Sequence, residues 1–599
     1  MIEKMKKITL LVSEKDRGEF ISRLRRTGVV HVRHVTRPVH HEINFIEEKI
    51  SKIEQMLSVL APYAEKGQQD WRASSREKDV LGKVEEITQA DREKQDLLSL
   101  SRDVENKIQW FGAWGEFYPE DVSSLREKRV YINLYRLNRQ EFKNLEKDVP
   151  HIVIGRERGY VRIATVYMGQ EQVLPFKQVT LPEAGPAKLR HQTDGISKRI
   201  GEREGFLKEQ ARSAEAMKKC LKKLKKEHEA LLIKFGMREE DAFSFLQGFC
   251  PEKALDKIRS LAEQNDLGYL LEDPDDPDET PTLITNPKWV KIIDPVFRFM
   301  NTLPGYKEFD ISFLFLMFFS LFFAMLIGDA GYGLLFFLVT FFVRRRFRDL
   351  PAEPFLLMYV LSAGTVVWGV ITGTYFGVEK IAQLPFLNIL VIHKISSFAE
   401  SSQNAVIFIC FVIGAAQLTI AHLMRAVKVI NSIIALAQVG WVFILWGMFF
   451  AAGKFVIGNA FPAFAGWFLI AGICLVLFFT NPKKGFFKGA IITMASLPLS
   501  VISSFSDIVS YLRLFAVGYA TVVMAESFNN LALGGGINSV IGGVAAAVIL
   551  FLGHTLNIIL GFMAVIVHGI RLNMLEFSNH LGMQWSGSKY EPFCENPET

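Results

Sequence analysis

The chain has 599 residues, a formal net charge of +6 and 49% hydrophobic residues. This length exceeds that of one domain, and the sequence carries neither a basic patch interleaved with aromatic residues nor a recognition-helix motif, which excludes nucleic acid as a partner. The five cysteines are scattered without C-x-x-C spacing, so neither a disulfide framework nor a metal site is expected.

The composition changes abruptly near residues 301–310. Residues 1–300 are rich in Lys, Arg and Glu, whereas residues 311–580 are dominated by Phe, Leu, Ile, Val, Gly and Ala. This contrast predicts a cytoplasmic domain over 1–300 and a membrane domain over 301–599. The first residues hold too few apolar side chains before charges return to form a signal peptide, so we expect the first domain to stay in the cytoplasm.

Two small lobes are expected within the first domain. Residues 6–35 and 243–273 each read as strand, helix and strand, because β-rich runs flank amphipathic stretches. We expect them to pair as a proximal α/β lobe over about 1–40 plus 243–290. A further strand-rich segment predicts a distal lobe over about 115–180.

Apolar residues at heptad spacing occupy the segments between the lobes. The first seam contains Ile43, Ile46, Ile50, Ile53, Leu57 and Leu60, and the second contains Ile200, Leu207, Ala214, Met217, Leu221, Leu224, His228 and Leu231. The seams predict an antiparallel coiled-coil arm formed by about 43–110 and 189–235, with the distal lobe at its tip. From heptads alone, a spacer or dimerisation coil is as good an interpretation as a strut that touches other subunits at both ends.

Apolar segments in the second half predict about eight transmembrane helices. They lie at about 311–326, 332–343, 355–376, 404–424, 430–452, 463–480, 488–531 and 540–578. The last two are too long to cross upright, so we expect them to be tilted. Basic loops at 344–353, 425–429 and 481–488 place the N-terminal domain and the C-terminus in the cytoplasm. The expected fold is therefore an α-helical polytopic membrane protein with an N-terminal cytoplasmic α+β domain.

Arginines interrupt both of the long segments. Arg513 lies in SYLRLFAVGYA and Arg571 in VHGIRLNMLEF, although an arginine at the bilayer centre costs roughly 2.5–3.5 kcal/mol on insertion scales. An ordinary explanation would be an ion pair inside the bundle, of Arg513 with Asp507 or Glu526 and of Arg571 with Glu576. For a single arginine we weigh that explanation equally with a functional one.

The polar residues that surround the two arginines favour a role in ion translocation. The faces that carry them are small or polar, with Ser506, Ser510, Arg513, Val517 and Ala520 on one helix and Asn557, Gly561, Ala564, His568, Arg571 and Ser578 on the other. A purely structural bundle rarely carries so many polar groups within the membrane. A permanently charged guanidinium favours the ionised form of a carboxylate that moves past it. No carboxylate of this chain suits the moving role, so a partner must supply it.

No hydrolytic signature is present. Walker A, HExxH, GxSxG and kinase motifs are all missing from the sequence. The segment GDAGYG at 328–333 is interpreted as a tight turn between spans, with Asp329 as a cap or packing group. We expect no catalytic activity of the chain alone and no cofactor.

The segments SYLRLFAVGYA and VHGIRLNMLEF resemble the arginine signatures of subunit a, also called subunit I, of V-type and A-type rotary ATPases or ATP synthases. IGDAGYG and FLQGFCPEKALDKI resemble further family segments, so the resemblance covers essentially the whole chain. It implies that both arginines face a ring of proteolipid subunits whose carboxylates carry H⁺ or Na⁺ past two half-channels. The candidate residues for lining them are, in order, Glu526, Asp507, Glu576 and His568, with Ser510 and Asn557 on the same polar faces.

The resemblance also implies a place in a complex. The arm would be a stator that holds peripheral-stalk subunits, in a prokaryotic complex of the cell membrane that contains other V/A-ATPase subunits. Eukaryotic members often carry a histidine where Asp507 aligns and an acidic residue where Gly561 aligns, so their half-channel positions are not transferred. The alternative is a secondary ion transporter with a cytoplasmic regulatory arm. It predicts an inverted repeat, which the sequence does not show, and a membrane scaffold leaves both arginines unexplained.

Overall fold

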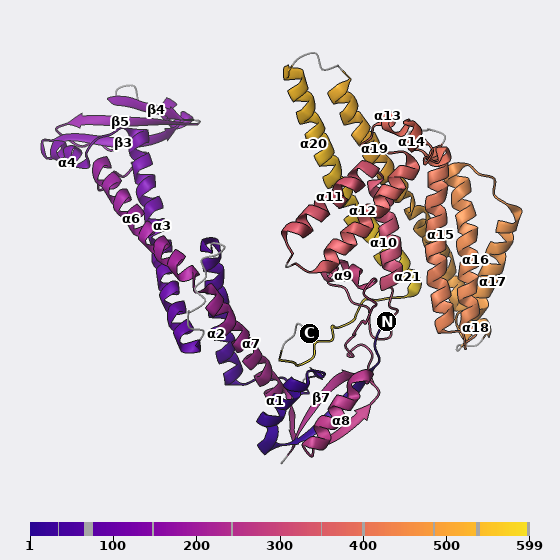
Figure 1. Cartoon of the computed structure of the whole chain (residues 1–599). Helices are drawn as coiled ribbons and strands as arrows, with labels where there is room; N and C mark the ends of the chain where they lie inside the picture. Colours follow the sequence, from indigo (N-terminus) through magenta and orange to yellow (C-terminus); the bar gives the residue numbers. More distant parts are fainter. Residues whose placement is uncertain are drawn as a thin grey trace. The chain divides into compact units, whose positions relative to one another are not determined.

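The computed structural model describes residues 1–595 except for 34, 65–75, 146–148, 158, 241–242, 349, 398–401, 483–485 and 535–539. Parts of the expected arm (65–75) and of one basic loop (483–485) thus lie outside the described residues. The chain forms two compact units, one of residues 1–11, 24–33 and 247–599 and one of residues 12–23 and 34–246. The apolar helices belong to the first unit, and the long soluble helices belong to the second (Figure 1).

A small mixed lobe belongs mainly to the first unit. Its sheet has the order β2-β7-β1-β8, with β1 (Met5–Ser13), β2 (His31–Arg33), β7 (Phe243–Pro251) and β8 (Gly268–Glu272). β1 is antiparallel to β8, and β2 is antiparallel to β7. The period-two pattern of β1 buries Ile8, Leu10 and Val12. Helices α1 (Arg17–Thr27) and α8 (Leu255–Gln264) accompany the sheet.

The C-terminal segment returns to this lobe. Phe593 N donates to Val30 O over 2.9 Å, and the Tyr590 hydroxyl donates to Val29 O over 2.5 Å. Phe593 is buried beneath the Arg25 guanidinium, which lies 4.5 Å from the ring centroid. Burial raises the pKa of the Tyr590 hydroxyl. The C-terminal segment and the lobe are therefore on the same side of the apolar helices.

Long helices and a second sheet make up the other unit. The helices are α2 (His41–Leu60), α3 (Glu77–Trp114), α6 (Pro186–Ala211) and α7 (Ala214–Gly236). α3 packs on α6 and α2 on α7, and Ile53, Leu207 and Met217 of the expected seams are buried in a shared cluster. The sheet is antiparallel in the order β3-β5-β4, with β3 (Val130–Asn138), β4 (His151–Glu157) and β5 (Tyr160–Met168). The shorter elements are α4 (Pro119–Glu127), α5 (Arg139–Lys143) and β6 (Arg238–Glu240).

The apolar half is entirely helical where the structure describes it. Its longer helices are α10 (Ser312–Ile327), α11 (Ala330–Arg346), α12 (Ala352–Thr372), α15 (Gln403–Lys428), α16 (Ile434–Ala452), α17 (Ala463–Phe479), α18 (Phe486–Ser510), α19 (Leu512–Leu533) and α20 (Val540–Ala564). The π-helical segments η9 (Val565–Gly569) and η10 (Leu572–Phe577) and then α21 (Ser578–Leu581) continue α20. Three short helices are α9 (Asp294–Met300), α13 (Glu379–Ala382) and α14 (Pro385–Asn388).

Five helices among the described residues are long and apolar enough to cross a membrane, or six if the bent pair α10–α11 is one span. The expected count of eight is therefore not confirmed. The difference arises because α10 and α11 meet at 119°, and because α17 falls in the class of shorter apolar helices. The coarser expectation, a mostly helical chain with several apolar spans and an N-terminal α/β domain, is confirmed.

Asp329 fixes the bend between α10 and α11. Gly328 has φ +66°, which a side chain would strain, and the Asp329 carboxylate accepts hydrogen bonds from the backbone N–H groups of Gly331, Tyr332, Phe376 and Gly377. This confirms the interpretation of GDAGYG as a turn capped by Asp329. The cap also ties the bend to the chain that follows α12.

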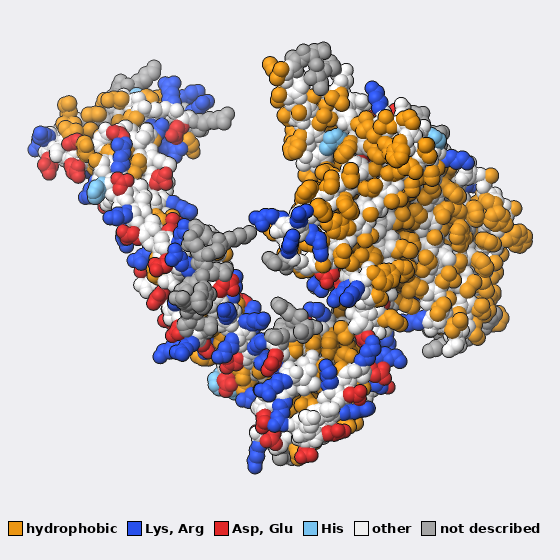
Figure 2. Space-filling model, viewed as in Figure 1, with side chains coloured by type: hydrophobic (Ala, Val, Ile, Leu, Met, Phe, Trp, Pro, Cys, Tyr) orange, Lys and Arg blue, Asp and Glu red, His pale blue; other side chains and the backbone are white. Residues whose placement is uncertain are grey.

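The surfaces of the two halves differ in chemistry. Figure 2 shows hydrophobic side chains gathered over the apolar helices, whereas Lys, Arg, Asp and Glu side chains cover the soluble elements. Large apolar side chains such as Phe342, Trp467 and Phe551 are exposed on those helices. Such a continuous apolar surface fits contact with lipid or with partner helices.

Candidate functional site

The helix that carries Arg513 is interrupted directly before it. α18 ends at Ser510 and α19 begins at Leu512, so Tyr511 joins two helices. An interrupted helix offers carbonyl groups for other donors, and Arg513 Nε donates to the Ser510 carbonyl over 3.0 Å. The backbone of α18 therefore holds the guanidinium in the first turn of α19.

Glu576 is the acidic partner of Arg513. The Arg513 guanidinium donates to Glu576 Oε1, and Arg571 Nε lies 3.6 Å from the same oxygen. Glu576 sits on the π-helical segment η10, and π-helical turns are frequent at functional sites. Arg513 thus pairs across helices with Glu576 rather than with Asp507 or Glu526, which the ordinary explanation had as its partners.

Exposure and charge set this cluster apart from a closed ion pair. The Glu576 side chain is 5% exposed, that of Arg513 is 24% exposed and that of Arg571 is 55% exposed. Two guanidinium groups share one carboxylate, so the cluster keeps one positive charge in excess. Glu576 Oε2 is buried without a hydrogen-bond partner in the described part of the chain. The excess charge opens onto the surface of an apolar helix.

Buried amides support the cluster from behind. The Tyr511 hydroxyl donates to Gln417 Oε1 over 2.8 Å, and Gln417 Nε2 donates to Asn573 Oδ1 over 2.9 Å. Asn573 Nδ2 reaches the Gly569 carbonyl over 3.3 Å. Tyr511, Gln417 and Asn573 are all fully buried. Since α15, α19 and η10 are joined through these groups, the geometry of the arginines is fixed by the bundle core.

A polar cavity of about 270 Å³ is lined on α18 by residues that precede Arg513. Its lining consists of His422, Arg425, Trp441, Ser500, Ser503, Ser504, Asp507, Asn579 and His580. Asp507 Oδ2 lies 3.0 Å from His580 Nε2. We call it the first cavity.

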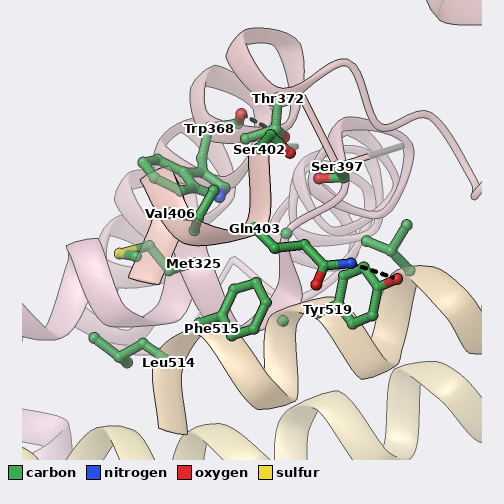
Figure 3. A pocket seen from close by; sticks show the side chains of 13 residues that line it. Met325, Trp368, Thr372, Ser397, Ser402, Gln403, Val406, Leu514, Phe515 and Tyr519 are labelled. Atoms are coloured by element: carbon green, nitrogen blue, oxygen red, sulfur yellow. Dashed lines mark hydrogen bonds between the residues drawn. The ribbon is translucent and has the colours of Figure 1, made fainter. Parts of the chain in front are cut away.

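A tighter cavity of about 40 Å³ is lined on α19 by residues that follow Arg513. Figure 3 shows its lining, in which Leu514, Phe515 and Tyr519 come from α19 and Gln403 from α15. Gln403 Nε2 donates to the Tyr519 hydroxyl over 3.2 Å. The wall also carries hydroxyl groups, those of Thr372, Ser397 and Ser402. Along α18–α19, the lining residues of the first cavity precede Arg513 and those of this second cavity follow it.

Asn557 belongs to a separate buried network. Asn557 Nδ2 donates to the Tyr332 hydroxyl over 3.1 Å and to the Thr521 carbonyl over 2.8 Å. The Tyr332 hydroxyl lies 2.6 Å from His554 Nδ1, and His554 Nε2 lies 3.1 Å from Asn529 Oδ1. This network joins α11, α19 and α20, and it does not include either arginine.

The structure brings together only part of the predicted set. Arg513, Arg571, Glu576 and the Ser510 backbone meet, and half-buried His568 interacts electrostatically with both arginines. Asp507 lines the first cavity, Asn557 lies in its own network, and Glu526 is exposed on α19. The contributing residues that sequence reasoning did not single out are Gln417, His422, Gln438, Asn573 and His580.

One possible metal-ligating group occurs elsewhere among the described residues. His40, His41 and Glu42, at the start of α2, place their ligand atoms within 4.8 Å of one another. The His40 ring stacks on Phe235 with centroids 3.8 Å apart, and its Nδ1 accepts from Glu42 N over 3.3 Å. Local packing accounts for this arrangement, which belongs to the soluble helices.

Comparison with known proteins decides the family. The chain matches no protein-family model, but it is 32% identical over 621 aligned residues to the V-type ATP synthase subunit I of Borreliella burgdorferi, covering 99% of both chains. The chain belongs to the family of subunit I of V-type and A-type ATP synthases. The resemblance noted in the sequence is thereby confirmed.

More distant members span bacteria and archaea. The V-type ATP synthase subunit I 1 of Treponema pallidum is 26% identical over 99% of this chain and 100% of its own length. The A-type ATP synthase subunit I of Methanocaldococcus jannaschii is 27% identical over 68% of this chain and 64% of its own length. Membership makes the chain a multi-pass membrane subunit of a V/A-type ATPase that is not itself catalytic.

Proposed function

We propose that the chain is the ion-translocating stator subunit of a rotary V/A-type ATPase. Its membrane domain would form two half-channels against a proteolipid ring and couple H⁺ or Na⁺ movement to ATP hydrolysis or synthesis. Its partners would be the ring, peripheral-stalk subunits and the other subunits of the complex. One observation carries the proposal: Arg571 presents a guanidinium that is 55% exposed on an apolar helix.

That exposure calls for a partner. Lipid hydrocarbon is a poor environment for a guanidinium, because inserting an arginine at the bilayer centre costs roughly 2.5–3.5 kcal/mol. The excess positive charge of the Arg513–Glu576–Arg571 cluster suits a carboxylate that arrives from outside the chain. Because the guanidinium stays charged, it stabilises the arriving carboxylate in its ionised form. An ion bound to that carboxylate is then released before it passes.

Two cavities support a two-path route. The first cavity precedes Arg513 along α18 and the second follows it along α19. Half-channels that open to opposite sides, with the arginines between them, would force an ion to travel with the ring instead of leaking directly. In this scheme Asp507 lines one path, while Glu526, exposed on α19, and His568 lie toward the ring.

The topology of the proposal follows the basic residues. Arg344, Arg345 and Arg346 end α11, and Arg425 and Lys428 occupy the last turn of α15. By the positive-inside rule these ends are cytoplasmic, together with the lobe, the C-terminal segment and the first cavity. We retain eight crossing segments in the cell membrane, with α10 and α11 counted separately and the final two tilted.

The soluble helices form the stator arm of this proposal. Its domains are the proximal lobe (1–40 plus 243–290), the antiparallel coiled-coil arm (43–110 and 189–235) and the distal lobe (115–180). α3 has 38 residues, which makes it about 57 Å long at about 1.5 Å per residue. An arm of this length can resist torque at a point remote from the membrane by holding peripheral-stalk subunits.

Photocrosslinking in the assembled complex tests the proposal. Leu575 lies one turn from Arg571 and is 50% exposed, so a photoreactive side chain at that position should crosslink to a small, Gly- and Ala-rich proteolipid with one buried carboxylate. Trp467, exposed on α17, serves as the matched control and should crosslink to lipid. Exclusive lipid products at position 575, as at 467, would contradict the proposal.

A further inference from the structure

A chain of hydrogen bonds runs through the first cavity. Gln438 Oε1 lies 2.9 Å from His422 Nδ1, and His422 Nε2 lies 2.9 Å from His580 Nδ1. His580 Nε2 in turn lies 3.0 Å from Asp507 Oδ2. The four residues come from α16, α15, α21 and α18, so packing of four helices sets the order. None of these four residues contacts Arg513, Arg571 or Glu576 among the hydrogen bonds and ion pairs of the described residues, so the series is separate from the arginine cluster.

Gln438, at one end of this series of hydrogen bonds, determines which ring nitrogens of the two histidines carry protons. The Gln438 amide oxygen can only accept a hydrogen bond, so His422 carries its proton on Nδ1 and offers the lone pair of Nε2. His580 must then donate from Nδ1, which turns the second ring nitrogen, Nε2, toward Asp507. A single proton is therefore shared between His580 Nε2 and Asp507 Oδ2.

Solvent exposure rises along the hydrogen-bond series from Gln438 and His422 to Asp507. His422 and Gln438 are buried, the His580 side chain is 10% exposed and the Asp507 side chain is 25% exposed. The cavity beside them is lined by the hydroxyls of Ser500, Ser503 and Ser504. The shared proton thus lies at the more exposed end of the series, whereas the buried residues His422 and Gln438 hold the His580 ring in place.

We propose that His580 and Asp507 form a proton-exchange pair in one access path, with His422 and Gln438 as positioning residues, and that the transported ion is H⁺. The inference rests on the proposed function. In one direction, the O–H bond of a partner's carboxylic acid breaks and its proton binds Asp507 Oδ2, while the proton already shared by the pair forms an N–H bond at His580 Nε2. The partner's carboxylate then faces Arg513. The new N–H bond next breaks to a water in the cavity, which restores the pair, and the reverse sequence loads the partner.

The same lining is unsuited to Na⁺. A hard cation binds to oxygen ligands, and beside the oxygens of Ser500, Ser503, Ser504, Asp507 and Asn579 this cavity presents two imidazoles, the Trp441 indole and the positively charged Arg425 guanidinium. The Arg425 guanidinium repels a free Na⁺, whereas a proton that moves along the His580–Asp507 hydrogen bond stays beside the Asp507 carboxylate. The groups that face the pair from α15, α16, α18 and α21 therefore favour proton transfer.

The test uses the purified complex in vesicles, with ATP-driven acidification and sodium uptake both followed. His580→Ala should slow acidification by about tenfold or more, and added imidazole should restore part of the rate. Asp507→Asn should slow acidification without rescue by imidazole. His422→Ala should shift the pH profile of pumping, since it frees the His580 tautomer. His393→Ala, an exposed histidine outside both cavities, should behave as wild type.

The outcomes separate this inference from the proposed function. Wild-type rates in His580→Ala would overturn the exchange pair, and ATP-driven sodium uptake that persists with a protonophore would overturn the choice of H⁺. Both results leave an ion-pumping stator intact. Wild-type rates in Arg513→Ala would instead overturn the proposed function. If His580→Ala fails to assemble, the wild type still decides, because equal rates in light and heavy water, together with sodium-dependent pumping, contradict proton transfer.

Discussion

Charged residues serve opposite purposes in the two regions of this molecule. On the soluble helices, ion pairs such as Lys94–Glu204 join neighbouring helices near the surface, with the Lys94 side chain 14% and the Glu204 side chain 47% exposed. In the apolar half, Arg513, Arg571 and Glu576 form one cluster around a carboxylate that is 5% exposed. Exposed pairs are worth about 0–1 kcal/mol, whereas removing one member of a buried pair costs about 3–5 kcal/mol. The burial of a charged residue, rather than the number of charges, therefore decides how much it contributes to stability.

Loss of Glu576 should break this comparison most strongly. Glu576→Gln keeps the shape of the side chain but leaves two guanidinium groups without their carboxylate, so we expect a loss of about 3–5 kcal/mol. The measurement is the thermal midpoint of the detergent-solubilised complex, with Glu353→Gln as a control at the start of α12. Equal thermal midpoints for Glu576→Gln and wild type would mean that the cluster does not stabilise the complex.

A core position of the soluble helices should respond through packing instead. Leu207 of α6 is fully buried in the cluster that joins α2, α3, α6 and α7. Leu207→Ala should cost about 2–5 kcal/mol, measured by denaturant unfolding followed by circular dichroism. Lys208→Ala, at the neighbouring exposed position, is the control. A cost below about 1 kcal/mol for Leu207→Ala would show that these helices do not depend on this seam.

Close backbone contact in the apolar half should be sensitive to one added carbon. A Cβ at Gly369 of α12 would lie 2.1 Å from Ala330 N at the start of α11. Gly369→Ala should therefore cost about 1–3 kcal/mol through overpacking, seen as a lower thermal midpoint of the complex. Gly466→Ala, where the added carbon meets nothing within 4 Å, should leave the midpoint unchanged. If both variants behave alike, α11 and α12 can separate without cost.

The smallest effect is expected at the soluble surface. Lys94→Ala removes the pair with Glu204, 2.8 Å away, and a hydrogen bond to the Tyr63 hydroxyl. Solvent screening limits the cost to about 0–1 kcal/mol, and the difference in the free energy of unfolding should shrink from low to high salt. A loss comparable to that of Glu576→Gln would erase the contrast between the two regions.

Local patterns in the sequence predicted the elements well where each element supplies its own signal. The alternation in β1, the heptads that bury Ile53 and Met217, and the cap at Asp329 are all readable from neighbouring residues. The bend between α10 and α11 was not predicted as such, because hydropathy records apolar length but not direction. A turn between two spans and a sharp bend at 119° give the same apolar pattern.

Cross-helix pairing explains what the sequence left open in the site. Glu576 lies five positions after Arg571, so their proximity was foreseeable, but its bond to Arg513 depends on how η10 packs beside α19. Gln417 and His422 lie on α15, far from the arginines in sequence, and carry no motif. Isolated amides and histidines in apolar helices gain meaning only from the partners that packing brings to them.

Ion uptake into vesicles that hold the purified complex tests the central claim most directly. Wild type, Arg513→Ala and the control Lys454→Ala, exposed on the segment after α16, are compared at matched assembly with ATP as the driving force. The account predicts that Arg513→Ala abolishes pumping while the complex stays assembled, and that Lys454→Ala pumps as wild type. Pumping by Arg513→Ala at near wild-type rates would reduce Arg513 to a structural partner of Glu576 and contradict the account.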